Sequence, residues 1–196
     1  SVTGYKWSSA FAGMVRGTDN LIKCASFGSV KSCNNACNAG GLIGGFSGTV
    51  TIDTSFSTAN ENGWWSGGFI GDAEGGTALI ADSYCTGNVV GAGKQGAIVG
   101  NQGGVVTLKD VFWWQGGNPN AGTANFGANS THTPFIYKES KAVVAEKDDA
   151  PLADMLNVEN DNWASQTCML STGPGTANVS KYVIPILKGM KVSFCE

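Results

Sequence analysis

Charged side chains are scarce in this chain of 196 residues, and basic ones are scarcer than acidic ones. Lysine and arginine total 12 against 15 acidic residues, which gives a net charge of −3, and no basic cluster occurs. Nucleic-acid binding is therefore not expected, because contacts with phosphates need concentrated lysine and arginine. Long apolar runs are also missing, so the sequence predicts no membrane insertion.

Histidine and closely spaced cysteine pairs are equally rare, which limits the chemistry available to the chain. His132 is the single histidine, and it lies in a loop sequence without an acidic neighbour. A nucleophile–histidine–acid arrangement would depend on that residue alone. No Cys-x-x-Cys pair occurs and His132 is far from every cysteine in the sequence, so we expect no metal site and no cofactor.

The six cysteines form an even set, which favours disulfides in an oxidising compartment. Six cysteines allow many pairings, so any connectivity read from sequence is one hypothesis among several. We expect one bridge that closes a short loop, one that joins the last strand to its neighbour, and one between the two remaining cysteines: Cys33–Cys37, Cys168–Cys195 and Cys24–Cys85.

Glycine, by contrast, is abundant, with 29 residues, and it recurs in a motif repeated about every 28 residues over the first 115 positions. An aromatic residue follows the central apolar residue of each copy (Met14, Leu42, Phe69 or Ile98) by 13 to 15 positions. Two columns that keep one period indicate stacked supersecondary units. The motifs are Ala12–Gly17, Gly40–Gly45, Gly67–Asp72 and Gly96–Asn101, and the aromatic column is Phe27, Phe56, Tyr84 and Phe112.

Each unit contains short β-branched runs between glycines, which favour strands over helices. The sequence therefore predicts an all-β fold, a β-solenoid (β-helix-like) of about four 28-residue coils with a small C-terminal capping segment. The alternative is a β-sandwich in which the glycine spacing arises by chance. The aromatic column is expected to form one interior ladder of the solenoid, and a second is expected from Met14, Leu42, Phe69 and Ile98.

Changes in composition divide the chain into three parts. Residues 1–115 are assigned to the solenoid repeats, and 116–133 to a Gly/Asn-rich loop or irregular coil. Residues 134–196 are expected to form a cap over the open solenoid end, with a separate binding module as the alternative. Within this cap the sequence predicts a short helix from Leu152 to Leu156, followed by terminal strands, and Pro185 favours an edge position.

The runs Gly40-Gly41-Leu42-Ile43-Gly44 and Gly67-Gly68-Phe69-Ile70-Gly71 are each followed by a strand that ends in Ser-Phe or Ser-Tyr, and they resemble GLUG repeats. The resemblance covers about residues 10–115. GLUG repeats occur mainly in secreted or surface-anchored bacterial proteins, so the resemblance implies an extracellular or cell-surface location. The chain departs from the family pattern at the position of its Asn, which is occupied here by Ala25, Thr54, Asp82 and Asp110.

Adjacent tryptophans provide the clearest functional signal. In a strand, one member of each of the pairs Trp64-Trp65 and Trp113-Trp114 would face outward. Exposed indoles beside amides such as Gln115 are suited to stacking on sugar rings, so we assign these five residues to ligand binding. The alternative is that the indoles cover the outer face of the solenoid or dock the C-terminal segment.

The leading hypothesis is a non-catalytic extracellular or cell-surface domain that acts in adhesion or ligand binding, or as a subunit of an extracellular filament or appendage. Its expected partners are a glycan or a cell-surface protein, copies of itself, or a parent polypeptide. The alternative is a carbohydrate-active enzyme that cleaves polysaccharide with Asp82 and Asp110, which occupy equivalent positions on consecutive coils, about 5 Å apart. Their position in the repeat favours a role in turns.

Overall fold

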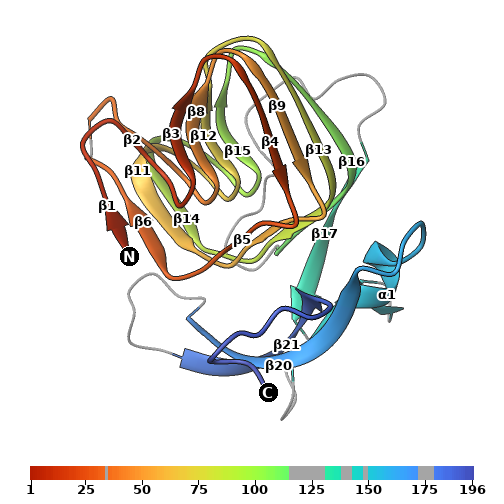
Figure 1. The fold of residues 1–196 in the computed structure, drawn as a ribbon. Coiled ribbons are helices and arrows are strands. Elements are labelled where there is room, and N and C mark those ends of the chain that lie inside the picture. The colour runs from red at the N-terminus through yellow and green to blue at the C-terminus, as the bar shows by residue number, and fades with distance from the viewer. Residues whose placement is uncertain (34, 115–130, 138–142, 148–149, 172–178) are drawn as a thin grey trace.

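The computed structural model describes residues 1–33, 35–114, 131–137, 143–147, 150–171 and 179–196. These residues form a β-solenoid of about four turns, followed by a small β-hairpin near the C-terminus. The predicted fold class is therefore confirmed. Figure 1 looks along the solenoid, so that the corresponding strands of successive coils lie behind one another.

Each coil repeats the same path, and strands that are broken in the first two coils are continuous in the last two. Coil 1 contains β1 (Val2–Thr3), β2 (Trp7–Ser8), β3 (Ala12–Val15), β4 (Thr18–Ile22) and β5 (Ala25–Ser26). Coil 2 contains β6 (Ser29–Lys31), β7 (Asn38–Gly40), β8 (Ile43–Phe46), β9 (Thr49–Asp53) and β10 (Phe56–Ser57). Coil 3 contains β11 (Asn60–Gly67), β12 (Ile70–Ala73) and β13 (Thr77–Cys85), and coil 4 contains β14 (Val89–Gly96), β15 (Val99–Gln102) and β16 (Val105–Trp114).

Corresponding strands pair in parallel and build three sheets. Sheet A consists of β1, β2, β6, β7, β11 and β14, and sheet B of β3, β8, β12 and β15. Sheet C begins with β4, β5, β9, β10, β13 and β16 and continues into the C-terminal part of the chain. Since no coil can bury its own apolar face, each coil depends on its neighbours for stability.

The main core lies between sheets B and C. Leu42, Phe69 and Ile98 are fully buried and connected by backbone hydrogen bonds between consecutive coils, which confirms the predicted ladder for coils 2 to 4. Met14 does not belong to it, because Met14 pairs with Gly45. The corresponding residue of coil 1 is Phe11, whose N–H donates to the carbonyl of Leu42.

A loop insertion explains this shift. Val2 pairs with Val30, 28 positions later, whereas Trp7 pairs with Asn38, 31 positions later. Coil 2 therefore has three more residues than coil 1 between its first two strands. The extra residues lie in the loop that contains the Cys33–Cys37 disulfide.

The aromatic column was expected inside the solenoid, and this expectation is wrong. Phe56, Tyr84 and Phe112 are aligned on consecutive coils, but they belong to a second cluster that is separate from the core between sheets B and C. Phe27 is not in register with them, since Ala25 pairs with Phe56. Its ring nevertheless contacts that of Phe56 edge-on, with centroids 5.3 Å apart.

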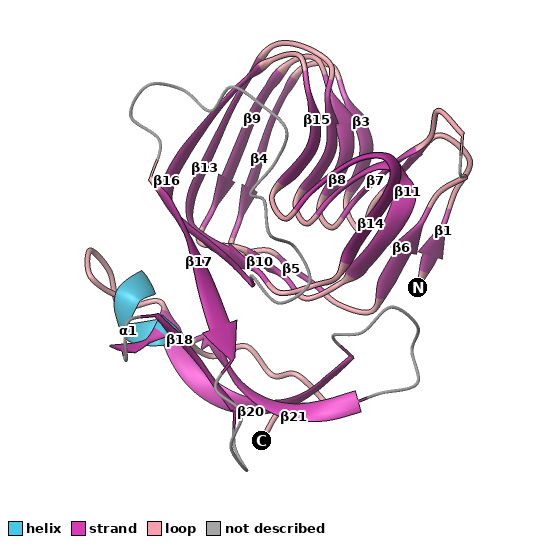
Figure 2. Ribbon diagram, turned by 180° about the vertical axis from the view of Figure 1, so that it is seen from behind, coloured by secondary structure: helices cyan, strands magenta, loops and turns pink. Residues whose placement is uncertain are grey.

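The second cluster is completed by the C-terminal module, which we define as the described residues between 132 and 196. Its elements are β17 (His132–Tyr137), β18 (Val143–Lys147), β19 (Ala150–Pro151), α1 (Leu152–Leu156), β20 (Trp163–Ser171) and β21 (Val179–Leu187). Strand β17 pairs in parallel with the end of β16 and then in antiparallel fashion with β18, and it leads from the solenoid into the module (Figure 2). The helix matches the predicted range.

The C-terminal module packs along the side of the solenoid, not across its open end as the sequence predicted. The Trp163 ring lies 5.5 Å from Tyr84, and the Phe194 ring lies 4.9 Å from Phe27. The Tyr84 hydroxyl donates a hydrogen bond to the carbonyl of Pro185. The physical reason is the aromatic column itself, because a row of aromatic rings on the outside of the solenoid must be covered.

Two of the three expected disulfides are present, Cys33–Cys37 and Cys168–Cys195. The third is wrong, since Cys24 and Cys85 are both free. Cys24 lies in coil 1 and Cys85 in coil 3, so two coil steps of about 4.8 Å separate them even before their offset along the strand. This exceeds the separation of about 7 Å between Cα atoms that a disulfide can span.

Replacing Cys168 and Cys195 by serine is expected to lower the free energy of unfolding by about 3 kcal/mol, because this bridge closes a loop of 27 positions. The matched Cys33→Ser, Cys37→Ser variant should lose clearly less, because its loop spans only 4 positions. Urea denaturation of the oxidised proteins measures both losses. Equal losses in the two variants would contradict an origin in loop closure.

Candidate functional site

The glycine motif forms the sharp bend between sheets A and B. A Cβ atom on Gly40 would lie 1.9 Å from the carbonyl oxygen of Ile43, and one on Gly71 would lie 2.8 Å from that of Ala39. Only glycine permits backbone atoms to approach this closely. The motif that dominates the sequence is therefore explained by packing, and it brings two rows of side chains to face each other across the bend.

These rows, which we call the A–B junction, carry a polar network that connects coils 2, 3 and 4. Asp72 is 1% exposed, and its Oδ2 accepts a hydrogen bond of 2.9 Å from Nδ2 of Asn38. Its Oδ1 accepts one of 2.8 Å from Nδ2 of Asn101. Asn101 Oδ1 in turn accepts a hydrogen bond of 2.6 Å from Nζ of Lys94.

Opposing influences act on the pKa of the Asp72 carboxyl. Burial raises the pKa of its carboxyl, and nearby Glu74 adds to the increase. The hydrogen bonds from Asn101 and Asn38 lower it, as does the positive charge of Lys94. Because burial is the largest influence, the pKa of Asp72 lies above its ordinary value, which makes this carboxyl a group able to exchange a proton closer to neutral pH.

Trp64 and Trp65 lie beside this network, and both are half-buried. The pairing register between β11 and β14 shifts between Gly63 and Trp65, where one residue of β11 faces two of β14. Gly63 faces the interior, where a Cβ atom would lie 2.4 Å from Ser32 Oγ, and Ser66 is fully buried. Both indoles therefore lie on the outer side of sheet A, although strict strand alternation would place only one there.

The second tryptophan pair has a different environment. Trp113 is 6% exposed and belongs to the main core, with its ring 5.5 Å from that of His132. Trp114 packs against the cluster formed with the C-terminal module. Gln115 lies outside the described residues. Of the four tryptophans assigned to a ligand, Trp64 and Trp65 thus present outward indole surface.

Asp82 and Asp110, the alternative catalytic pair, occupy turns in the left-handed backbone region, with φ of 45° and 53°. Thr54 and Lys23 have the same conformation in coils 2 and 1, so the residue of coil 1 that corresponds to Thr54, Asp82 and Asp110 is Lys23 and not Ala25. Asparagine and aspartate tolerate this conformation better than most residues, which accounts for aspartate at this position in coils 3 and 4.

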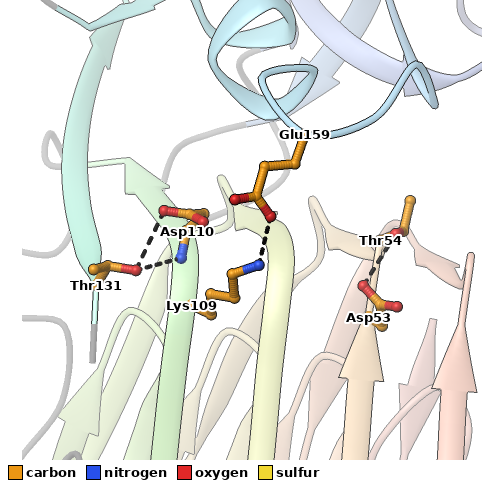
Figure 3. A network of polar contacts seen from close by, with 6 residues as sticks. All are labelled: Asp53, Thr54, Lys109, Asp110, Thr131 and Glu159. Atoms are coloured by element: carbon orange, nitrogen blue, oxygen red, sulfur yellow. Dashed lines mark hydrogen bonds and ion pairs between the residues drawn. The ribbon is translucent and has the colours of Figure 1, made fainter. Parts of the chain in front are cut away.

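The same row of turns docks the C-terminal module. Asp110 N–H donates a hydrogen bond of 2.6 Å to Thr131 Oγ1, and the Thr131 hydroxyl lies 3.3 Å from Asp110 Oδ1 (Figure 3). Lys109 Nζ lies 2.6 Å from Glu159 Oε2, which reaches over from the module (Figure 3). Burial, followed by the charge of Asp53, raises the pKa of Asp82. These contacts explain the acidic residues as parts of turns and of a docking surface.

Within the described ranges, no group of three or more histidine, cysteine or acidic side chains is arranged to hold a metal ion. In that same part of the chain, no helix has the length and apolar character needed to cross a membrane. Comparisons with protein-family models, curated proteins and solved structures found no match for this chain. The resemblance to GLUG repeats therefore rests on its motifs alone.

Sequence reasoning did not find the polar network of the A–B junction. A signal was present, because Asp72 and Asn101 close the third and fourth copies of the glycine motif at equivalent positions. Their partners were not recognisable, since Asn38 and Lys94 precede the motif and meet it only through the bend between the sheets.

Proposed function

We propose that this chain is a non-catalytic binding domain of the extracellular space or cell surface, which holds a glycan or protein ligand on the outer side of sheet A. The observation that carries the proposal is the pair Trp64 and Trp65, two adjacent indoles on the same side of a rigid sheet. Indoles present a large apolar face together with an N–H donor, a combination that suits the faces and hydroxyl groups of sugar rings.

Three further features support this proposal. Asn62 is exposed on β11, two residues before Trp64, and supplies an amide near the indoles. Because the site is built on paired strands and not on a mobile loop, little conformational entropy is lost when a ligand binds. The two disulfides are compatible with an oxidising compartment, in agreement with the proposed location.

Self-assembly into a filament or appendage is a second candidate, favoured by apolar side chains that are exposed on coil 1. Phe11 is 52% exposed, although the corresponding Leu42 of coil 2 is fully buried, and Ile22 is 56% exposed. An open edge with apolar side chains is a template for pairing with another chain.

A glycan-array screen of the folded, oxidised protein tests the proposal. Selective binding is expected, and Trp64→Ala and Trp65→Ala should each weaken it about tenfold, the equivalent of one lost stacking contact. Tyr5→Ala serves as the control, because Tyr5 is an aromatic residue that is 84% exposed on coil 1. It should bind like the wild type.

Thermal unfolding of the same variants separates binding from folding. The proposal requires that both tryptophan variants unfold close to the wild-type temperature. A collapse of the fold would show that the indoles are structural and would contradict it. A blank array together with an apparent mass that grows with concentration in size-exclusion chromatography would favour the filament subunit.

A further inference from the structure

The A–B junction brings a primary amine, a carboxamide and a buried carboxylic acid together at coil 4. We propose that Lys94 and Asn101 become joined by an intramolecular amide (isopeptide) bond, with Asp72 as the group that transfers the proton. The bond would connect β14 of sheet A with β15 of sheet B across the glycine bend.

Hydrogen bonds already hold the three side chains next to one another. Lys94 Nζ lies 2.6 Å from Oδ1 of Asn101, which places the amine next to Cγ, the carbon it must attack. Asp72 Oδ1 lies 2.8 Å from Nδ2 of Asn101, the nitrogen that must leave. Groups held at such distances react as if at very high local concentration.

Asp72 is fixed for this role by its surroundings. Its second oxygen accepts a hydrogen bond from Asn38, and the side chain is buried, so the carboxyl cannot rotate away from Asn101. Burial also raises the pKa of Asp72, and Lys94 is close enough to act on that pKa through its charge. A carboxyl in this state both accepts and returns a proton, as general acid–base catalysis requires.

The reaction balances without an oxidant or any further reactant. The neutral amine of Lys94 attacks Cγ of Asn101, so that the Nζ–Cγ bond forms and the Cγ–Nδ2 bond breaks. Asp72 takes one proton from Nζ and delivers one to Nδ2, and ammonia departs. The product accumulates because the released ammonia diffuses away and the step is not reversed.

The rigid sheets explain why this contact persists long enough for a slow reaction. Lys94 and Asn101 stand on strands that are paired to the preceding coil, at Trp65 and Asp72 respectively. Between them the chain turns at Gly96 and Gly100, where a Cβ atom on Gly100 would lie 2.6 Å from the carbonyl oxygen of Ser66. The bend is therefore tightly packed, and it keeps the two backbone positions that carry these side chains at a fixed separation.

Mass spectrometry of the intact, reduced and denatured protein tests the proposal. The expected mass is lower than that of the sequence by one ammonia, about 17 Da. Trypsin gives a second readout, because the sequence has no lysine or arginine between Lys31 and Lys94. A crosslinked chain yields one peptide that covers 32–109 and contains an internal loop from 94 to 101, since cleavage after Lys94 is blocked. An uncrosslinked chain yields 32–94 and 95–109 separately.

Two variants show whether the loss of ammonia comes from the proposed bond. Lys94→Arg keeps the positive charge on an exposed position but cannot form this amide, and Asp72→Asn removes the proton transfer at nearly constant size. Both should have the full sequence mass. Thermal unfolding of Lys94→Arg confirms that its fold is retained, so the test stands even where Asp72→Asn is unstable.

One competing reaction has the same mass change. The exposed Asn62 precedes Gly63, and such a pair can lose ammonia by forming a succinimide in its own backbone. The succinimide would still form in the Lys94→Arg variant. In the wild type it would leave the tryptic site after Lys94 open to cleavage. A loss of ammonia with this behaviour, or an intact mass without any loss after prolonged incubation of the wild type, would overturn the proposal.

Discussion

Replacing Gly67 by alanine is expected to destabilise the solenoid by at least about 4 kcal/mol, near the upper end of single-residue effects. The added Cβ would lie 2.1 Å from the carbonyl oxygen of Ile70 and 2.6 Å from the backbone nitrogen of Gly100. Both obstacles are backbone atoms, one in the same coil and one in the next, so neither can move aside by a change of rotamer. Urea denaturation followed by circular dichroism measures the loss.

Gly75→Ala is the matched control for this prediction. Gly75 has no atom within 4 Å of its Cβ position and belongs to the same coil. Its substitution should therefore change the free energy of unfolding by no more than about 0.5 kcal/mol. If Gly67→Ala were tolerated as well as Gly75→Ala, the close approach of sheets A and B described here would be wrong.

The repeat made most of the fold predictable. A solenoid needs the same side chain at the same place in every coil, so its core appears in the sequence as a period that can be counted. Leu42, Phe69 and Ile98 follow that period and are buried together. Four turns and an all-β fold follow from the same count, as does the position of the glycines at the bends.

The register of coil 1 was not predictable from the motif. The segment Ala12–Gly17 fits the pattern of small and apolar residues at more than one offset, and the shift of three positions originates elsewhere, in the loop of coil 2. An insertion in a loop leaves no trace in the strands that follow it. Only the pairing between coils, which is a tertiary contact, reveals that Phe11 and not Met14 stands beside Leu42.

The orientation of side chains was also beyond the pattern at two places. Tyr84 would be buried whether its side chain pointed into the solenoid or out of it, because the C-terminal module covers the outside of the solenoid at that point. Trp64 and Trp65 lie on the same side because the register between β11 and β14 shifts there. Both features depend on partners distant in sequence. The sequence therefore predicted an outward-facing indole in the pair but not that both face outward, and it did not predict the polar network beside them.

Glu61 lies in the interior of the solenoid, and no described residue forms an ion pair with its carboxyl. Glu61 is 1% exposed, and its Oε1 accepts a hydrogen bond of 3.3 Å from the Ser57 hydroxyl, which itself accepts one of 2.8 Å from Ser26. Its Oε2 is buried without a hydrogen-bond partner. Burial raises the pKa of Glu61 well above its ordinary value, against a weaker lowering by Ser57. The carboxyl therefore keeps its proton to a higher pH than an exposed glutamate does.

Glu61→Gln is expected to change how stability depends on pH. A pKa that is higher in the folded than in the unfolded protein stabilises the fold fully below the unfolded value, near 4.3 for glutamate, and this contribution is lost as the pH rises toward the folded value. Glutamine does not ionise, so the wild type should lose stability relative to the variant by about 1.4 kcal/mol for each pH unit in this interval. Urea denaturation of both proteins at a series of pH values from about 4 upward measures the difference. Because the other titrating groups are common to both proteins, a difference that stays constant across this range would show that Glu61 is ionised inside the folded solenoid.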